Sequence, residues 1–522
     1  MSMYLEEYIL KHKKISNVDK IKNILMGVLI FCAMLEMTFF SSVANLIGVV
    51  VSVLSCLIYF HYILCPAFYK LNPLLFLVSI MPFGFMYLPL PATLLDGNSI
   101  SHDFFNPEIT FILQFLYFIV FVFALKVASK LSFIHRGLNH LLNKVGFFYA
   151  PTFFQTYLLA AFGWIFQYLK LISQFSGEGV YVANFGTYSM FSVFIYAPLV
   201  NFFRDLMGDK PCSKTEKVIT WFYFVFLSLS MVATNSRGAI LSPTLIILLC
   251  FFIKRIVARG EMYFFTYRNI FLTVLLFLLV SGPFNDMAYA MLMVRGERKN
   301  LDYNELFSST LRYYNNKSAL TRFKQIIEND ASQRYSNKDW DESYVSNIFL
   351  QRFCNYRVVD ATIYHALRAG IPNEKMRDDF MNRLIAMFPQ PIVKMISPSF
   401  KKERYAYSPM DLLYSQSNKQ SIHVSYIVGG DVGLGIATFG LMYFPLVFFV
   451  YVVQLLILAN MVKLTLKGWK FSFFTLISVF GVFLSFQVGS GFISHVQYIL
   501  WSCWWGLIWR LIPFRLLTIR WN

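Results

Sequence analysis

The residue type best suited to chemistry here is an arginine in a tight turn between two long apolar runs, Thr234-Asn235-Ser236-Arg237-Gly238. A guanidinium is permanently charged, and placing it beside lipid is costly, so an arginine at a membrane edge is a candidate for function. Its fork of donors matches phosphate oxygens two at a time. The turn therefore predicts that Arg237 binds the diphosphate of a lipid-linked substrate. The structural alternative is a snorkelling side chain that caps the preceding helix.

A second group of charges lies in residues 352–360, Arg-Phe-Cys-Asn-Tyr-Arg-Val-Val-Asp. On a single helix, Arg352 and Tyr356 share one face, and Arg357 and Asp360 lie three apart on a neighbouring stripe. We expect Arg352 and Arg357 to be further diphosphate ligands and Asp360 to be a catalytic carboxylate. The alternative is a structural ion pair between Arg357 and Asp360.

His423 and Asp431 flank a turn that leads back into apolar sequence. Either side chain could take a proton from a sugar hydroxyl, and we predict both to be catalytic. Four glycines among residues 429–435 predict a close approach of the backbone to a neighbouring element. A plain turn at the start of a helix is the alternative. The histidines lack metal-ligand spacing, and no nucleotide-binding fingerprint is present, so the sequence predicts no metal and no cofactor.

The elements that position these residues are long apolar runs. The chain of 522 residues is 57% hydrophobic and 14% charged, whereas a soluble protein carries roughly 25% charged residues. Runs of about 17–25 residues are long enough to cross a bilayer. We place them at 21–40, 43–64, 71–90, 109–128, 147–172, 187–203, 218–234, 239–253, 269–285, 433–461, 471–489 and 492–511. The prediction is an all-α polytopic membrane protein with about 12 transmembrane helices.

The charge distribution predicts the orientation. Outside residues 286–432, all lysines and arginines except Lys170 and Arg237 fall on alternate connections between the runs. The positive-inside rule places those connections and both termini in the cytoplasm. The net charge of +18 is thus explained by orientation in a lipid bilayer, and we expect no nucleic-acid partner.

Three regions follow from this pattern. Residues 1–285 form an N-terminal transmembrane bundle of about nine spans, residues 286–432 one large, mostly helical external insertion, and residues 433–522 a C-terminal bundle of about three spans. Within the insertion, helical spacing of apolar residues predicts helices over 317–328 and 376–388. The second helix is amphipathic, so it either lies on the bilayer or above a cavity, or packs within a small core of the insertion.

This layout resembles Wzy-type O-antigen and capsular polysaccharide polymerases, which are related to the O-antigen ligases of the membrane-embedded glycosyltransferase C superfamily. The likeness rests on about twelve spans, the large external insertion, Ser236-Arg237-Gly238, residues 352–360 and the turn at 423–435. The resemblance implies a glycosyltransferase of the bacterial inner membrane that contributes to lipopolysaccharide or capsule. Its donor and acceptor would be undecaprenyl-diphosphate-linked glycans, and a chain-length regulator protein is an implied partner.

Two other functions compete with the polymerase. A flippase for lipid-linked oligosaccharides is one. Transporters usually show hydropathy repeats and broken helices at the membrane midplane, and the sequence shows neither clearly. The O-antigen ligase is the other. Ligases carry a histidine followed by a spaced glycine pair, and here Val424 follows His423 and the glycine spacing differs, which favours the polymerase.

Overall fold

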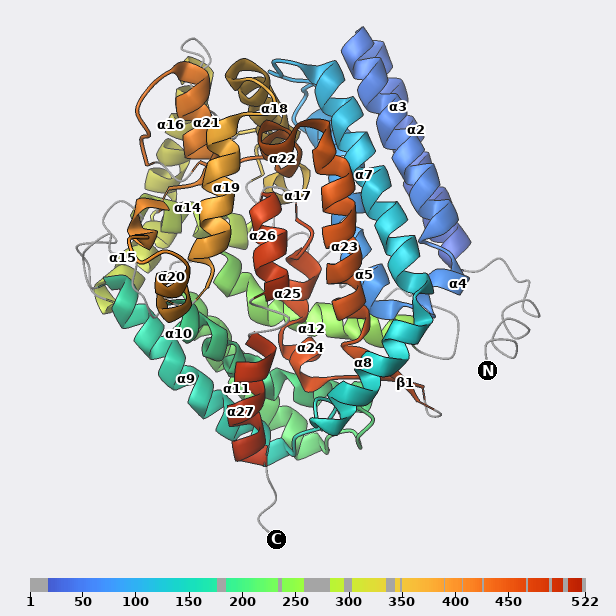
Figure 1. Cartoon of the computed structure of the whole chain (residues 1–522), viewed down its shortest axis with the longest axis vertical. Coiled ribbons are helices and arrows are strands. Elements are labelled where there is room, and N and C mark those ends of the chain that lie inside the picture. Colours follow the sequence, from blue (N-terminus) through green and yellow to red (C-terminus); the bar gives the residue numbers. More distant parts are fainter. Residues whose placement is uncertain are drawn as a thin grey trace. The chain divides into compact units, whose positions relative to one another are not determined.

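The computed structural model describes residues 17–175, 185–232, 237–257, 282–294, 303–334, 343–347, 350–388, 390–405, 407–424, 427–465, 468–487, 491–500 and 506–518. These residues are helical throughout, apart from connecting turns and one short two-stranded hairpin (Figure 1). Contacts between residues divide the chain into two compact units. Unit 1 comprises Met1–Leu131, Asp339–Ile457 and Leu484–Ser502, and unit 2 comprises Ser132–Lys338, Leu458–Phe483 and Cys503–Asn522.

Unit 1 combines the first apolar helices of the chain with the second half of the predicted insertion. Its elements are α2 (Asn17–Phe39), α3 (Val43–Tyr62), α4 (Pro66–Tyr69), α5 (Pro73–Tyr87), α6 (Pro89–Leu95), α7 (Pro107–Lys130), α17 (Gln351–Cys354), α18 (Tyr356–Ala369), α19 (Glu374–Ala386), α20 (Gln390–Ile396), η3 (Lys402–Tyr405), α21 (Pro409–Asn418), α22 (Asp431–Phe439), η4 (Gly440–Met442), α23 (Tyr443–Ala459) and α26 (Phe492–Gln497). Helices α2, α3 and α7 lie side by side (Figure 1).

Glycines let two helices of unit 1 approach closely. A Cβ atom on Gly433 of α22 would lie 2.7 Å from the carbonyl carbon of Thr362 in α18, and a Cβ on Gly430 would lie 2.8 Å from the Cα of Val359. Only glycine fits such a backbone approach. The Gly430 N–H also donates to Thr362 Oγ1 at 2.8 Å. The close approach expected from the glycine-rich turn is therefore confirmed, and it fixes the start of α22 against α18.

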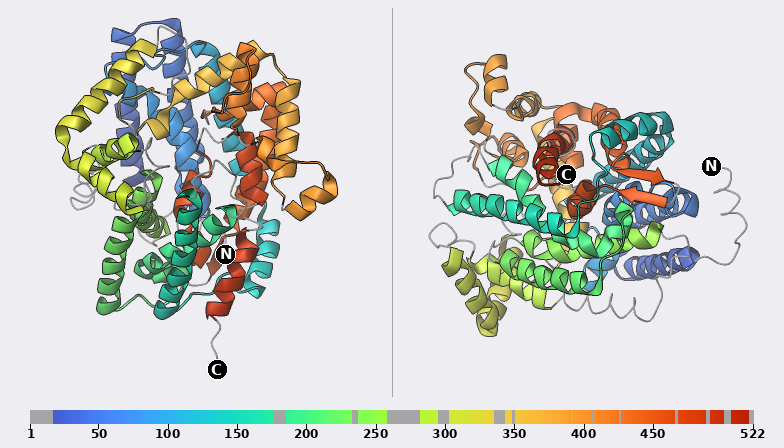
Figure 2. Two further views of the ribbon diagram at one scale, coloured as in Figure 1. Left: turned by 90° about the vertical axis from the view of Figure 1, so that its left-hand side faces the viewer. Right: turned by 90° about the horizontal axis from the view of Figure 1, so that it is seen from below.

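Unit 2 is built around a 3₁₀ helix, η1 (Val193–Met207), which packs against α9, α10, α11, α12 and α24. The other elements are α8 (Ser132–Lys144), α9 (Phe153–Phe175), α10 (Phe185–Ser192), α11 (Lys214–Val232), α12 (Arg237–Val257), α14 (Pro283–Val294), α15 (Tyr303–Asn315), α16 (Lys317–Arg334), β1 (Val462–Thr465), β2 (Gly468–Phe471), α24 (Phe473–Ile477), α25 (Val479–Leu484) and α27 (Gly506–Thr518). The strands β1 and β2 form an antiparallel hairpin (Figure 2). They pair Lys463 with Lys470 and Leu464 with Trp469.

The mostly helical architecture and the apolar helices agree with the sequence prediction. Five described helices are long and apolar enough to cross a membrane, and the pair α5 and α6, bent by 49°, makes up to six. They correspond to the runs predicted at 21–40, 43–64, 71–90, 109–128, 187–203 and 433–461. These five or six helices are fewer than the 12 spans expected from the sequence, so the number of about 12 stays a prediction. The run at 269–285 lies largely outside the described residues.

Three local expectations have clear outcomes. The helices predicted over 317–328 and 376–388 are confirmed as α16 and α19. The apolar run 471–489 does not form one long helix. It begins at the end of β2 and continues as two short helices, α24 and α25, which are separated by a turn at Ser478. The hairpin itself was not expected. The boundaries 1–285, 286–432 and 433–522 refer to the membrane rather than to contacts, and they stay a prediction.

Candidate functional site

Buried polar side chains in unit 1 converge on Asp431, the first residue of α22. Tyr117 comes from α7, Tyr451 and Gln454 from α23, and His495 from α26. We call these five residues the Asp431 cluster. Asp431 is 1% exposed and His495 is 2% exposed. Ionisable groups are costly inside a membrane helix bundle, so their burial together favours a functional role.

Hydrogen bonds connect the cluster. Asp431 Oδ2 accepts the Tyr117 hydroxyl at 3.0 Å and lies 3.4 Å from His495 Nε2. Asp431 Oδ1 accepts the backbone N–H of Gly491. Tyr117 and Tyr451 are in contact through their hydroxyls, and Tyr451 Oη lies 3.5 Å from His495 Nε2. The Asp431 carboxylate thus accepts hydrogen bonds from a residue that precedes it in the chain, Tyr117, and from one that follows it, Gly491.

The His495 imidazole lies beside the Asp431 carboxylate. His495 Nδ1 lies 3.2 Å from Gln454 Oε1, and Nε2 lies 3.4 Å from Asp431 Oδ2. A neutral imidazole has one lone pair on a ring nitrogen and a carboxylate has several on its oxygens, so both side chains can accept a proton. Asp431 and His495 together therefore form a proton acceptor, which is the property that a general base needs.

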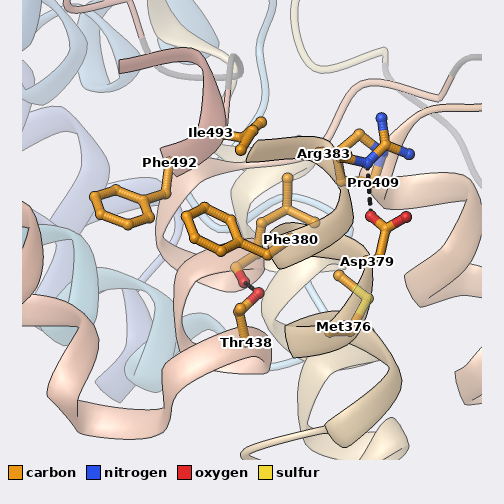
Figure 3. Close-up of a pocket in the computed structure, with 10 residues that line it drawn as sticks. Met376, Asp379, Phe380, Arg383, Pro409, Thr438, Phe492 and Ile493 are labelled. Carbon is orange, nitrogen blue, oxygen red and sulfur yellow. Dashed lines mark hydrogen bonds and ion pairs between the residues drawn. The ribbon is translucent and has the colours of Figure 1, made fainter. Parts of the chain in front are cut away.

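A pocket adjoins this cluster (Figure 3). It contains about 330 Å³ of empty space, part of which is open to solvent. It is lined by Met376, Asp379, Phe380 and Arg383 of α19, Pro409 of α21, Leu434 and Thr438 of α22, and Gly491, Phe492 and Ile493 at the start of α26. We call it the α19 pocket. Gly491 belongs to both features, because it lines the pocket and its N–H holds Asp431.

Gly491 also has the backbone conformation that favours glycine, with φ at +74°. A Cβ at this position would lie 3.3 Å from Leu434 Cδ1 on the opposite wall. A side chain here would be strained and would crowd the pocket. The glycine therefore keeps the wall between the pocket and Asp431 thin.

The charged part of the pocket is a pair on α19. Arg383 Nε donates to Asp379 Oδ2 at 2.6 Å (Figure 3). Arg383 Nη2 donates to the carbonyl of Tyr407 at 2.8 Å. The Tyr407 hydroxyl donates to Asp379 Oδ1 at 2.8 Å, and burial raises the pKa of this tyrosine. Two edges of the guanidinium are thus fixed, and Nη1 has no partner among the residues that the structure describes. A guanidinium held in this way is preorganised to bind an anion.

The apolar side of the pocket is aromatic. Phe380 of α19 and Phe492 of α26 stack with ring centroids 5.5 Å apart (Figure 3). The amphipathic helix predicted over 376–388 therefore covers a cavity and does not merely close a core of its own. The pocket offers one guanidinium, one carboxylate and aromatic rings, which is a set that suits a polar ligand with an apolar face.

Two predicted site residues have structural partners away from this pocket. Asp360 is fully buried and accepts the N–H groups of Phe105 and Asn106 and the hydroxyl of Thr110, at 2.6, 3.0 and 2.8 Å. These donors surround the N-terminus of α7, so Asp360 anchors that helix to α18. Burial raises the pKa of the Asp360 carboxyl, and the three hydrogen bonds oppose the rise. Its catalytic role stays a prediction.

Arg357 is also engaged. Its guanidinium donates to the Ser343 carbonyl at 3.0 Å and lies 3.5 Å from Asp103 Oδ2, and the residue is 6% exposed. The ion pair that we considered with Asp360 thus has Asp103 as its acidic partner. The expectation of one helix across 352–360 is wrong. Asn355 accepts the N–H of Val358 as the cap of α18, so α17 ends before it. Asparagine is among the preferred residues for such a cap.

Within unit 1, Arg352 and His423 make no recorded contact with the Asp431 cluster. Arg352, in α17, is exposed and its side chain makes no ion pair with any described residue. His423 is exposed in the segment after α21, and the structure records no hydrogen bond for it within its described residues. Arg237 is the first residue of α12 in unit 2, and its side chain lies outside the described residues. Among the predicted residues of unit 1 that the structure describes, Asp431 is the one that lies in the cluster, and the role of Arg237 stays a prediction.

Sequence reasoning missed Tyr117, Gln454, His495, Asp379 and Arg383. A signal was present for three of them, because Tyr117, Gln454 and His495 are polar residues within apolar runs, where such residues are rare and often functional. Asp379 and Arg383 are four apart on an amphipathic helix, a spacing that surface ion pairs also use. No group of three His, Cys, Asp or Glu residues in the described segments is placed to hold a metal ion.

No family model, curated protein or solved structure matches this chain. The function must therefore be inferred from the residues themselves and from the layout of the sequence.

Proposed function

We propose that this protein polymerises undecaprenyl-diphosphate-linked oligosaccharide units into O-antigen or capsular polysaccharide, as a glycosyltransferase of the bacterial inner membrane. About 12 helices would span the membrane, with both termini in the cytoplasm and residues 286–432 outside. The observation that carries the proposal is the buried Asp431–His495 pair beside a pocket that holds a fixed guanidinium. The resemblance in sequence layout supports the same activity.

The reaction needs a base and a stabilised leaving group. A hydroxyl oxygen of the acceptor unit attacks the anomeric carbon of the donor glycan, and the bond from that carbon to the diphosphate oxygen breaks. The electron pair leaves with the diphosphate. The hydroxyl proton passes to the Asp431–His495 pair, and a general base of this kind contributes about 10²–10⁴ in rate.

Arginines would take up the charge on the diphosphate. Arg383 is the cation in the α19 pocket, and Arg237 and Arg352 keep the role that the sequence assigns to them. Removing one preorganised donor for a developing negative charge typically costs about 10²–10³ in rate. Arg357 is less suited, because it is buried and already paired with Asp103.

Burial of the base sets a requirement. Asp431 is 1% exposed, so the acceptor hydroxyl reaches it only when the wall formed by Gly491 and Leu434 moves apart. Gly491 has no side chain, so the movement has to displace only the side chain of Leu434.

The test uses purified full-length protein in lipid vesicles with radiolabelled lipid-linked repeat units. The polymerase produces longer lipid-linked chains, and their length distribution is measured by gel electrophoresis. Movement of the labelled lipid across the bilayer without a new glycosidic bond would identify a flippase. Transfer to a lipid A core acceptor, but not to a second repeat unit, would identify a ligase. Either result would replace the proposal.

A further inference from the structure

The β1–β2 hairpin of unit 2 has two chemically different faces. Side chains alternate between the faces of a strand, so Val462, Leu464, Trp469 and Phe471 share one face and Lys463 and Lys470 the other. Val462 and Phe471 are buried in unit 2, whereas Leu464 is 42% exposed and Trp469 is partly exposed. The hairpin is therefore rooted in the unit at its base and presents apolar side chains towards its tip.

The two lysines face each other directly. Lys463 and Lys470 are cross-strand partners in the ladder, and like charges in that position repel. Burial and the charge of Lys463 lower the pKa of Lys470, while Asp209 acts in the opposite direction. Asp209 is already paired with Arg204, so its charge is shared. The lysine pair carries an excess of positive charge that an anion would neutralise.

Helix α8 extends this surface. Lys463 Nζ donates to Asn143 Oδ1 of α8 at 3.5 Å, and the neighbouring Lys144 is exposed. On the same helix Leu138 and Leu141, three residues apart and therefore on one face, are 37% and 58% exposed. We call Lys463, Lys470, Asn143 and Lys144 the lysine surface. It combines cations with exposed apolar side chains from two elements.

We propose that the lysine surface binds the phosphate headgroup of an anionic phospholipid, with the apolar face of α8 against the acyl chains. Charge complementarity selects an anion, and the exposed leucines of α8 select a lipid over a free phosphate, because lysines beside apolar side chains are typical of the membrane interface. The positive-inside rule places these lysines at the cytoplasmic leaflet, on the side opposite to the proposed polymerisation. The lipid site is independent of the proposed function.

Lipid binding to full-length protein in detergent tests this site. Native mass spectrometry measures retention of phosphatidylglycerol and of phosphatidylcholine with the same acyl chains, and the thermal unfolding midpoint is followed with each lipid. We expect tighter retention and a higher midpoint with phosphatidylglycerol. Each lysine near an anionic headgroup adds about fivefold in affinity, so Lys463→Gln with Lys470→Gln should weaken retention about 25-fold.

Matched variants distinguish binding at the lysine surface from a general effect of positive charge on the protein. Lys463→Arg with Lys470→Arg keeps both charges and should retain the lipid. Lys375→Gln with Lys394→Gln removes the same charge from exposed positions in unit 1 and should bind phosphatidylglycerol as the unaltered protein does. Without lipid, the Lys463→Gln, Lys470→Gln variant should unfold at the same or a higher temperature, because a repulsion is removed.

Four results would overturn the site. They are equal retention of the two lipids, undiminished phosphatidylglycerol binding by the Lys463→Gln, Lys470→Gln variant, an equal loss in the Lys375→Gln, Lys394→Gln control, and the same stabilisation by inorganic phosphate alone.

Discussion

Asp431 and His495 are 64 residues apart in the chain, yet Oδ2 of the carboxylate lies 3.4 Å from Nε2 of the imidazole. Both side chains are almost fully buried, and the Gly491 N–H that holds Asp431 also lines the α19 pocket. The pair thus lies directly behind the wall of the α19 pocket.

The pair should be the proton acceptor of the reaction. Asp431→Asn and His495→Ala each remove the place for the transferred proton, so we expect chain elongation to fall about 10²–10⁴-fold with normal protein levels in the membrane. The assay is polymer formation from lipid-linked repeat units. His61→Gln, an exposed histidine at the end of α3, is the matched control. A loss with His423→Gln but none with His495→Ala would return the role to His423.

The arginines should bind the diphosphate through the planar arrangement of the N–H donors of their guanidinium groups. Arg237→Lys and Arg383→Lys keep the charge but lose the planar donors, so each should reduce elongation about 10²-fold or more while membrane levels stay normal. Chain length on a gel is the measurement. Unchanged glycan length in Arg237→Lys would remove Arg237 from the site, and the same outcome for Arg383→Lys would leave its pair with Asp379 purely structural.

The contact between α18 and α22 should be intolerant of a single methyl group. In Gly433→Ala the new Cβ would meet backbone atoms of Thr362 and Ile363 at 2.7 and 2.8 Å, so the helices must separate. We expect a loss of about 1–3 kcal/mol in the free energy of unfolding, read from thermal or denaturant unfolding in detergent. Gly27→Ala in α2 is the control, since nothing lies within 4 Å of its added Cβ. Equal stability of the two variants would contradict the close packing.

Stability should fall in mild acid because of His365 in α18. Burial of the imidazole, helped by the charge of Arg368, lowers the pKa of His365 to about 4 from 6.5. The folded protein keeps the ring neutral, so this contribution is complete above pH 6.5 and is lost as the pH falls from 6.5 to 4. The loss is on the order of 3 kcal/mol. Unfolding curves at several pH values should show a shallower decline for His365→Gln, and His61→Gln, at an exposed position in α3, should follow the unaltered protein.

The orientation in the membrane should follow the charge pattern. A reporter that is active only outside the cytoplasm, fused after residue 350, should be active, whereas the same reporter after Lys130 should be inactive. Reporter activity is compared at equal expression. The reverse pattern would place the Asp431 cluster on the wrong side of the membrane for polymerisation.

The sequence by itself determined the mostly helical architecture and the position of the apolar helices. Both follow from local properties, because an apolar run of sufficient length forms a helix in lipid to satisfy its own backbone hydrogen bonds. The glycines at 429–435 also indicated a close helix contact, since only glycine leaves room for it. Asp431 was identified for a similar local reason, as a carboxylate at the start of an apolar run.

Only the tertiary structure decided which residues stand together. Tyr117, Tyr451 and His495 meet Asp431 from three other helices, and no spacing in the chain encodes that meeting. The sequence predicted a catalytic Asp360 and a diphosphate-binding Arg357, yet their charges are engaged by the α7 N-terminus and by Asp103, which lie about 250 positions away in the chain. A short polar pattern reports the chemistry that a side chain can perform. Its partner, and hence its role, depends on long-range packing that only the folded chain provides.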